Sequence, residues 1–126
     1  MQVTVSRARI AKKSKRLEEA AERRIGRAIE NGIEYLSLNT PVDTGAYANS
    51  MHLNARGDRS GHGETSHRKE RDVAANVVLN DMESRLRGSL QTLDVLDGAT
   101  FVNNAPHARY VEVYYGLFDQ LRDILK

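Results

Sequence analysis

The chain has 126 residues, of which 40% are hydrophobic and 29% charged, and its net charge is +2. This length and composition predict one globular domain, over residues 1–126, with a modest core. There is no cysteine, which excludes disulfides and thiolate metal sites. We expect no membrane contact, because no apolar run reaches the roughly 18 residues that cross a bilayer and the first residues do not resemble a signal peptide.

The charge is distributed unevenly along the chain. Residues 1–27 carry nine Lys or Arg against three Glu, whereas residues 72–126 carry five basic and eight acidic side chains. Opposite charge on the two halves favours head-to-tail association of identical subunits. A solvated basic helix beside an acidic half explains the same pattern equally well.

The first predicted element is a long helix over residues 6–38. Its apolar residues mostly recur every three or four positions and form one stripe: Ile10, Leu17, Ala21, Ile25, Ala28, Ile29, Ile33 and Leu36. Gly26 and Gly32 weaken the helix but leave room for another element to pack closely. Pro41 disfavours helical geometry at the residue before it, so the helix is expected to end near Leu38 or Asn39.

A turn and a strand are predicted next. Asp43 is suited to accept hydrogen bonds from nearby backbone donors, and Gly45 tolerates a positive φ. Weak alternation predicts a strand over residues 50–56. The polar loop that follows, residues 57–68, is rich in glycine and is expected to be mobile in the free monomer.

The middle of the chain predicts a helix and then a hairpin. A four-residue beat of apolar residues indicates a helix over residues 69–87, with Gly88 just beyond its end. Asp97-Gly98 lies between the apolar runs 93–96 and 99–102, which is a strong hairpin signal. In that hairpin Leu93 faces Val102.

Two short helices are expected to complete the domain. Pro106 is suited to the first turn of the first one, with Asn104 or Ala105 as its cap. We expect its packing surface to be formed by Val111, Tyr114 and Tyr115. Gly116 is expected to end that helix, and residues 117–125 then form a short amphipathic C-terminal helix. The sequence thus predicts an α+β fold, with a long N-terminal helix and a second helix packed on a small, mainly antiparallel sheet.

No residues in the sequence form a convincing catalytic or metal site. His62 and His67 flank Glu64, but no further ligand lies at a recognisable spacing, so an exposed polar loop is favoured over a zinc site. His52 and His107 are isolated. No Ser or Thr has a neighbouring base and oxyanion stabiliser, and Asp94 and Asp97 belong to a predicted turn. We therefore predict a protein without catalytic residues, bound metal or cofactor.

The basic N-terminal region suggests an alternative function. Its cations are suited to neutralise phosphates, which predicts a small DNA-binding or DNA-packaging accessory protein as the second hypothesis. Acidic residues follow at once, however, and no aromatic side chain precedes Tyr35 to stack on bases. The residues that would face DNA or a protein interface are Lys12, Lys13, Lys15, Arg16, Arg23 and Arg24.

Two segments carry a resemblance to a known family. The first is Thr40-Pro41-Val42-Asp43-Thr44-Gly45, and the second runs from Phe101 through Asn103-Asn104-Ala105-Pro106 to Tyr110-Val111-Glu112. They resemble the TPVDTG turn and the later Asn-rich corner and YVE helix of the neck and tail-completion proteins of long-tailed bacteriophages. That family includes minor tail protein Z and related head-tail joining proteins. His107 departs from the tyrosine that is usual in the family, and the chain also differs after Glu112.

The resemblance implies a non-enzymatic virion protein that acts by assembly. It implies a homo-oligomeric ring, with a hexamer favoured, at the head-tail junction or tail end, assembled in the host cytoplasm. The neighbours would be connector or head-closure proteins and tail-terminator or tail-tube proteins, and DNA would pass through the lumen only as cargo. The residues that would shape the structural turn and the assembly surface are Thr40, Pro41, Val42, Asp43, Thr44, Gly45, Asn103, Asn104, Pro106, Tyr110 and Glu112.

Overall fold

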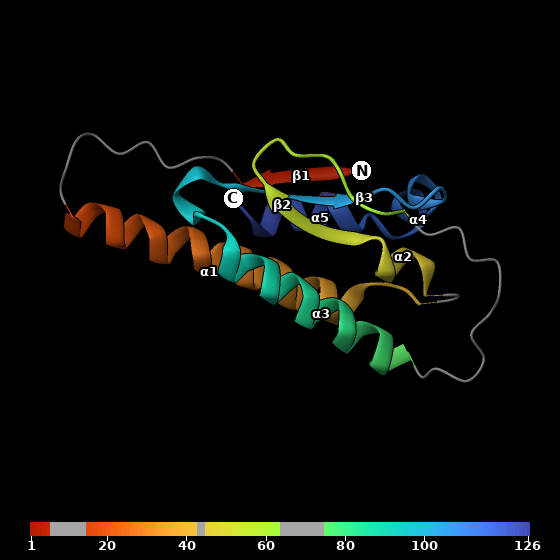
Figure 1. The fold of residues 1–126 in the computed structure, drawn as a ribbon. Helices are drawn as coiled ribbons and strands as arrows, with labels where there is room; N and C mark the ends of the chain where they lie inside the picture. Colours follow the sequence, from red (N-terminus) through yellow and green to blue (C-terminus); the bar gives the residue numbers. More distant parts are fainter. Residues whose placement is uncertain (6–14, 43–44, 64–74) are drawn as a thin grey trace.

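The computed structural model describes residues 1–5, 15–42, 45–63 and 75–126. In chain order the elements are strand β1 (Gln2–Val5), helices α1 (Lys15–Asn39) and α2 (Ala46–Asn49), strand β2 (Met51–Ala55), helix α3 (Ala75–Thr92), the 3-10 turn η1 (Val95–Asp97), strand β3 (Ala99–Asn103), and helices α4 (Ala108–Tyr115) and α5 (Leu117–Ile124). Helices α1 and α3 pack on a three-stranded antiparallel sheet, which confirms the predicted α+β fold (Figure 1).

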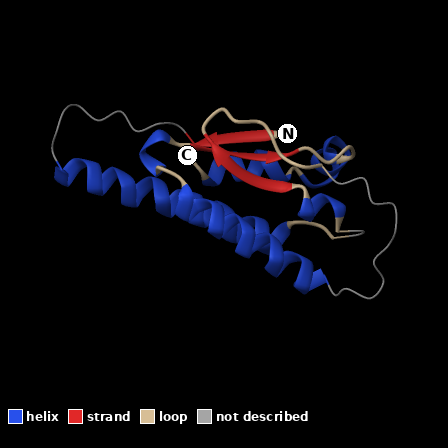
Figure 2. Cartoon of the chain, in the orientation of Figure 1, coloured by secondary structure: helices blue, strands red, loops and turns tan. Residues whose placement is uncertain are grey.

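The sheet has the strand order β1-β3-β2, so β3, the last of the three strands in the sequence, lies in the centre (Figure 2). Phe101 of β3 is paired with Val3 on one side and with Leu53 on the other. These three side chains are buried in the main hydrophobic cluster. Because side chains alternate along a strand, the same register places Thr4, Thr100 and Asn54 on the opposite, more polar face.

Helix α1 supplies much of the core through the stripe that the sequence predicts. Ile25, Ile29, Ile33 and Leu36 are buried, and the helix ends at Asn39 as expected. A Cβ at Gly32 would lie 3.1 Å from side-chain atoms of both Leu121 and Leu125 in the α5 region, so this glycine allows close packing of α5 on α1. Gly26 has no such neighbour within 4 Å.

The structure has a strand before the first helix that the sequence did not predict. Residues 2–5 form β1, which pairs with β3 across nearly the whole length of the chain. Residues 6–14 of the predicted helix lie outside the described residues. A short alternating run such as Gln2–Val5 gives little signal on its own, because its pairing partner lies far away in the sequence.

The predicted end of the second helix was wrong. Helix α3 passes through Gly88 and continues to Thr92. Leu90 and Leu93 beyond the glycine pack against the core. Both side chains are partly buried, so each gains part of the about 1.5–3 kcal/mol that full burial of a leucine contributes, and together they offset the roughly 1 kcal/mol that a helical glycine costs. The first predicted residues, 69–74, lie outside the described part.

The predicted hairpin was also wrong. Residues 95–97 form η1, capped by Asp94, whose side chain accepts a hydrogen bond of 3.2 Å from the Leu96 amide. Gly98, with φ 84°, then leads into β3. Leu93 therefore does not face Val102, which pairs with Gln2 and His52 instead. Both edges of β3 are occupied by strands from distant parts of the chain, which leaves no edge for a local partner.

Candidate functional site

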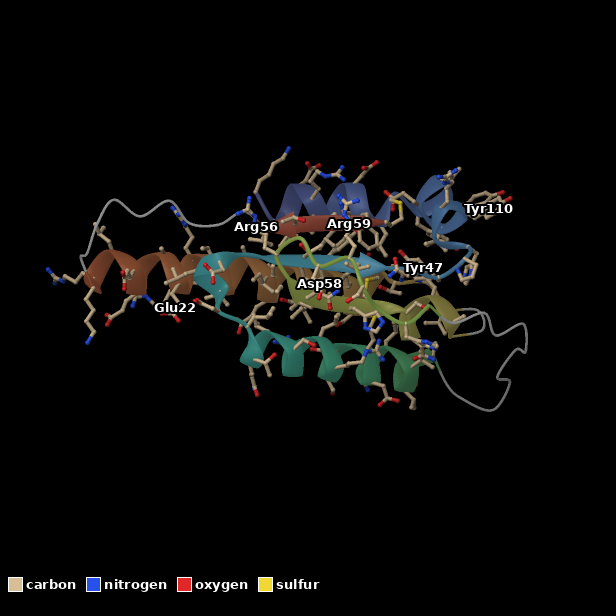
Figure 3. All side chains as sticks on the ribbon, turned by 45° about the horizontal axis from the view of Figure 1, so that its top comes forward. Glu22, Tyr47, Arg56, Asp58, Arg59 and Tyr110 are labelled. Atoms are coloured by element: carbon tan, nitrogen blue, oxygen red, sulfur yellow. The ribbon has the colours of Figure 1, made fainter. Side chains whose placement is uncertain are left out.

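The second segment that carries the family resemblance contacts α2, the helix that directly follows the first segment. We call this region the corner. The buried side chain of Asn103 donates a hydrogen bond of 2.8 Å to the carbonyl of Tyr47. Its own oxygen accepts one of 3.0 Å from the amide of Ala105. The rings of Tyr47 and His107 lie 6.2 Å apart at a tilt of 56°. Figure 3 shows Tyr47, a residue of α2, at this end of the sheet.

The first segment connects α1 to α2. Thr40 is buried and its amide bonds to the Leu36 carbonyl at 2.9 Å, and Val42 packs against the core. Gly45 has φ 84° and its carbonyl accepts from the Asn49 amide at 2.9 Å. The positive φ confirms the predicted role of this glycine. Asp43 and Thr44 lie outside the described residues, so the predicted cap by Asp43 stays a prediction.

The second segment binds the loop that follows β2. The exposed side chain of Asn104 donates to the carbonyls of Arg59 and Gly61 at 3.0 and 3.2 Å. A ring nitrogen of His52 lies 2.9 Å from the carbonyl of His62. The loop over residues 57–63 thus has several hydrogen bonds to the sheet region. The remaining residues of the loop expected to be mobile, 64–68, lie outside the described part, and so does His67.

The start of α4 differs from the prediction. Pro106 lies in a turn before the helix, where the Ala108 amide bonds to the Ala105 carbonyl at 3.0 Å. The residue at the N-cap is His107 rather than Asn104 or Ala105. The amide of Ala105 already bonds to the side chain of Asn103. Pro106 and His107 then form a turn, so the helix begins at Ala108.

Glu112 joins the two last helices. Its carboxylate accepts hydrogen bonds from the amides of Phe118 and Asp119, at 2.8 and 3.0 Å. These amides belong to the first turn of α5 and have no partner within that helix. Gly116 between the helices has φ 58° and ends α4, as predicted. Glu112 is therefore a capping residue that fixes the angle between α4 and α5.

One side of α4 is exposed and strongly apolar. The exposed fractions are 71% for Tyr110, 77% for Val113, 82% for Tyr114 and 59% for Tyr115. We call these four residues the aromatic face. The prediction that Tyr114 and Tyr115 pack inward was wrong, and only Val111 packs against the core as expected. Four large exposed side chains on eight residues are unusual for a surface without a partner.

The first turns of α1 extend beyond the sheet (Figure 1). The described cations of the predicted basic surface are all exposed: Lys15, Arg16, Arg23 and Arg24. Lys12 and Lys13 lie outside the described residues. Leu17 belongs to the same apolar stripe as Ile25 and is 56% exposed. The predicted basic surface is thus exposed over its described part, which also contains the partly exposed Leu17.

Burial raises the pKa of two tyrosines near the corner. For Tyr47 the main cause is loss of solvent and the second is the nearby negative charge of Glu112. The pKa of Tyr35 is raised for the same reasons, and its hydroxyl donates to Gln120 at 3.5 Å. The Tyr47 hydroxyl has no hydrogen-bond partner in the described part of the chain. Both groups are neutral at pH 7, because each pKa lies above the ordinary tyrosine value of 10.0.

Two of the described serine hydroxyls form local hydrogen bonds. The hydroxyls of Ser37 and Ser50 donate to carbonyls of their own helical segments, at Ile33 and Ala46. Within the described ranges, no three His, Cys, Asp or Glu side chains gather as metal ligands do. No described helix is both long enough and apolar enough to span a bilayer.

The chain matches no protein-family model, no curated protein and no solved structure.

Proposed function

We propose that this chain is a structural protein of a bacteriophage virion. It forms a ring, most simply a hexamer, at the head-tail junction or tail end, and it joins tail to head while leaving a lumen for DNA. The resemblance of residues 40–45 and 101–112 to neck and tail-completion proteins motivates this proposal. The structural observation that supports it best is the aromatic face of α4.

The aromatic face has the composition of an interface core. Tyrosine is enriched in protein interfaces, where truncating a central residue typically costs more than about 1 kcal/mol of binding. The face is also held rigidly, because Asn103 fixes the chain before α4 and Glu112 fixes the chain after it. A surface already ordered before binding loses less entropy on association.

A second surface lies at the other end of the molecule. The exposed start of α1 and the aromatic face on α4 are at opposite ends of the ribbon (Figure 1). Contacts between different surfaces of identical subunits are heterologous, and they close into rings when the rotation allows. Packing of the Leu17 end of α1 against the aromatic face of the next subunit would place cationic side chains near tyrosine rings, which is a favourable pairing.

The oligomeric state of the purified chain tests this proposal. Native mass spectrometry should show a discrete ring, and the double variant Val113→Ser with Tyr114→Ser should shift it to monomers. Both residues are largely exposed, so the monomer should keep its fold and melting temperature. Leu38→Ser is the matched control, since Leu38 is 75% exposed on α1. A monomeric wild-type protein under assembly conditions contradicts the proposal.

The alternative, a small DNA-binding or packaging accessory protein, is favoured by the exposure of Lys15, Arg16, Arg23 and Arg24. It predicts a monomer whose affinity for DNA falls steeply with salt. The double variant Arg16→Glu with Arg23→Glu reverses two positive charges and should abolish DNA binding under this alternative. Under the proposed function, the wild-type chain binds DNA weakly and forms rings without it.

A further inference from the structure

A groove of about 470 Å³ runs along β1, between α1 and the end of α5. Three cationic side chains line it: Arg24 from α1, with Arg122 and Lys126 from the C-terminal segment. Arg122 and Lys126 form ion pairs with Asp119 and Asp123, at 3.1 and 3.3 Å. These pairs are largely exposed and therefore weak, so both cations can exchange their partners for a bound anion.

The remainder of the groove is mainly apolar. The side chains that provide this lining are Val3, Val5, Ile25, Ala28 and Leu125. An occupant that fits must therefore combine apolar groups with negative charge. Small inorganic anions satisfy only the second requirement.

The backbone of β1 provides a further recognition element. In the described chain β1 pairs with β3 on one side only. The Asn103 amide bonds to the Met1 carbonyl at 3.1 Å, which makes these two residues a hydrogen-bonded pair. Such pairs alternate along antiparallel strands, so Thr4 opposite Thr100 is a non-hydrogen-bonded pair. Their hydroxyl oxygens lie only 3.0 Å apart, as expected for that kind of pair.

The N–H and C=O of Thr4 therefore point away from β3, and Thr4 itself lines the groove. A free strand edge of this kind can pair with an extended segment of another chain. The edge and the cationic groove are thus at the same place, although they are independent observations.

We propose that β1 and this groove bind an extended acidic segment of another protein by strand addition. The segment's backbone pairs with Thr4, its apolar side chains enter the groove, and its carboxylates contact Arg24, Arg122 and Lys126. A nucleic acid fits less well, because none of the described residues that line the groove is aromatic and an unpaired backbone edge matches a peptide. Residues 6–14 of the chain itself do not provide the acidic segment, because their charged side chains are Arg and Lys, which have the same charge as the groove.

This inference goes beyond the proposed ring and does not depend on it. The partner surface is separate from the aromatic face, so a variant that loses the ring should still bind the segment. Loss of binding and loss of assembly are thus measured independently.

The first test uses a labelled eight-residue peptide of alternating glutamate and valine, with blocked ends. Binding to the untagged full chain is followed by fluorescence anisotropy at low salt. Arg24→Glu should weaken binding at least about tenfold, because it reverses a charge at the groove. Arg27→Glu makes the same change on an exposed residue of the same helix that does not line the groove, and it should change affinity less than about twofold. A peptide of alternating lysine and valine should not bind.

The second test addresses strand pairing. The peptide should slow hydrogen exchange of the Thr4 amide, measured by NMR, and leave Val3, whose amide already faces β3, unchanged. Thr4→Pro removes the outward donor without removing a backbone hydrogen bond to β3, so it should weaken binding. It also removes the hydroxyl contact with Thr100, which Thr4→Val removes alone, so Thr4→Val is its control and should bind more tightly than Thr4→Pro. If that variant does not fold, a peptide methylated at its backbone nitrogens tests the same pairing. It cannot donate backbone hydrogen bonds to Thr4 and should bind more weakly than the unmodified peptide.

The proposal is overturned if the acidic peptide does not bind, or if Arg24→Glu and Arg27→Glu behave alike. It is equally overturned if the methylated peptide binds as well as the unmodified one and Thr4 exchange stays constant. If single-stranded DNA displaces the peptide while backbone methylation and Thr4 exchange have no effect, the groove is a nucleic-acid surface instead.

Discussion

The side-chain amide of Asn103 donates a hydrogen bond to the carbonyl of Tyr47, 56 residues earlier in the chain. The bond links the end of β3 to α2, and thus the second family-like segment to the helix that directly follows the first. Because Asn103 also accepts from the Ala105 amide, a single buried side chain satisfies two backbone groups. The corner that orients α4 depends on this residue.

Asn103→Ala should lower the free energy of unfolding by about 2–4 kcal/mol, since it leaves two buried backbone groups without partners. The neighbouring Asn104→Ala is the control. Asn104 is exposed, and water can replace its bonds to Arg59 and Gly61, so its loss should cost less than about 1 kcal/mol. Urea denaturation measures both. Equal effects at the two positions would contradict the role given to Asn103.

Gly45→Ala should destabilise the chain by about 1–2 kcal/mol through backbone strain alone, because φ is 84°. A Cβ there would lie 3.6 Å or more from its nearest neighbours, so no clash adds to this cost. Gly26→Ala, within α1 and with free space around it, should instead stabilise the chain by up to about 1 kcal/mol. Gly45→Val should also abolish ring formation. Rings of normal size from that variant would count against the corner as an assembly element.

Glu112→Ala should cost about 1–2 kcal/mol, because the amides of Phe118 and Asp119 lose their capping carboxylate. Glu112→Gln keeps an acceptor oxygen and should cost less. If the angle between α4 and α5 presents the aromatic face, Glu112→Ala should also weaken the ring in native mass spectrometry. Thermal melts with a dilution series separate the two effects, and an unchanged melting temperature for Glu112→Ala would be inconsistent with the cap.

Tyr47→Phe tests the buried hydroxyl through pH. Burial raises the Tyr47 pKa above its ordinary value of 10.0, so the folded chain releases this proton later than the unfolded chain. The stability that results is fully present below about pH 10 and is lost as pH rises through the folded pKa. Wild type should therefore lose stability in alkali more steeply than Tyr47→Phe. At pH 7 the variant should be within about 1 kcal/mol of wild type or more stable, because the hydroxyl has no described partner.

The control for this pH series is Tyr114→Phe, since Tyr114 is 82% exposed. Its unfolding free energy should depend on pH as that of wild type does. A Tyr47→Phe variant with the same alkaline slope as wild type would show that another group causes the loss of stability.

The sequence alone determined the features that depend on local chemistry. The stripe through Ile25 and Ile33 predicted the packed part of α1, because helical periodicity selects one buried face. Pro41 and Gly116 marked helix ends correctly, since each acts on its own backbone or that of its neighbour. The positive φ at Gly45 followed from the turn chemistry of its segment.

Only the tertiary structure decided which segments pair and which helix faces are covered. The Asp97-Gly98 pair has the local chemistry of a hairpin, yet β3 pairs with Gln2–Val5 and Met51–Ala55 because its register with those strands buries Phe101. Gly88 failed to end α3 because packing beyond it outweighed a small local cost. The outward direction of Tyr114 depends on where Asn103 and Glu112 anchor α4. Pairing and burial are set by the sum of long-range contacts, and no single segment encodes that sum.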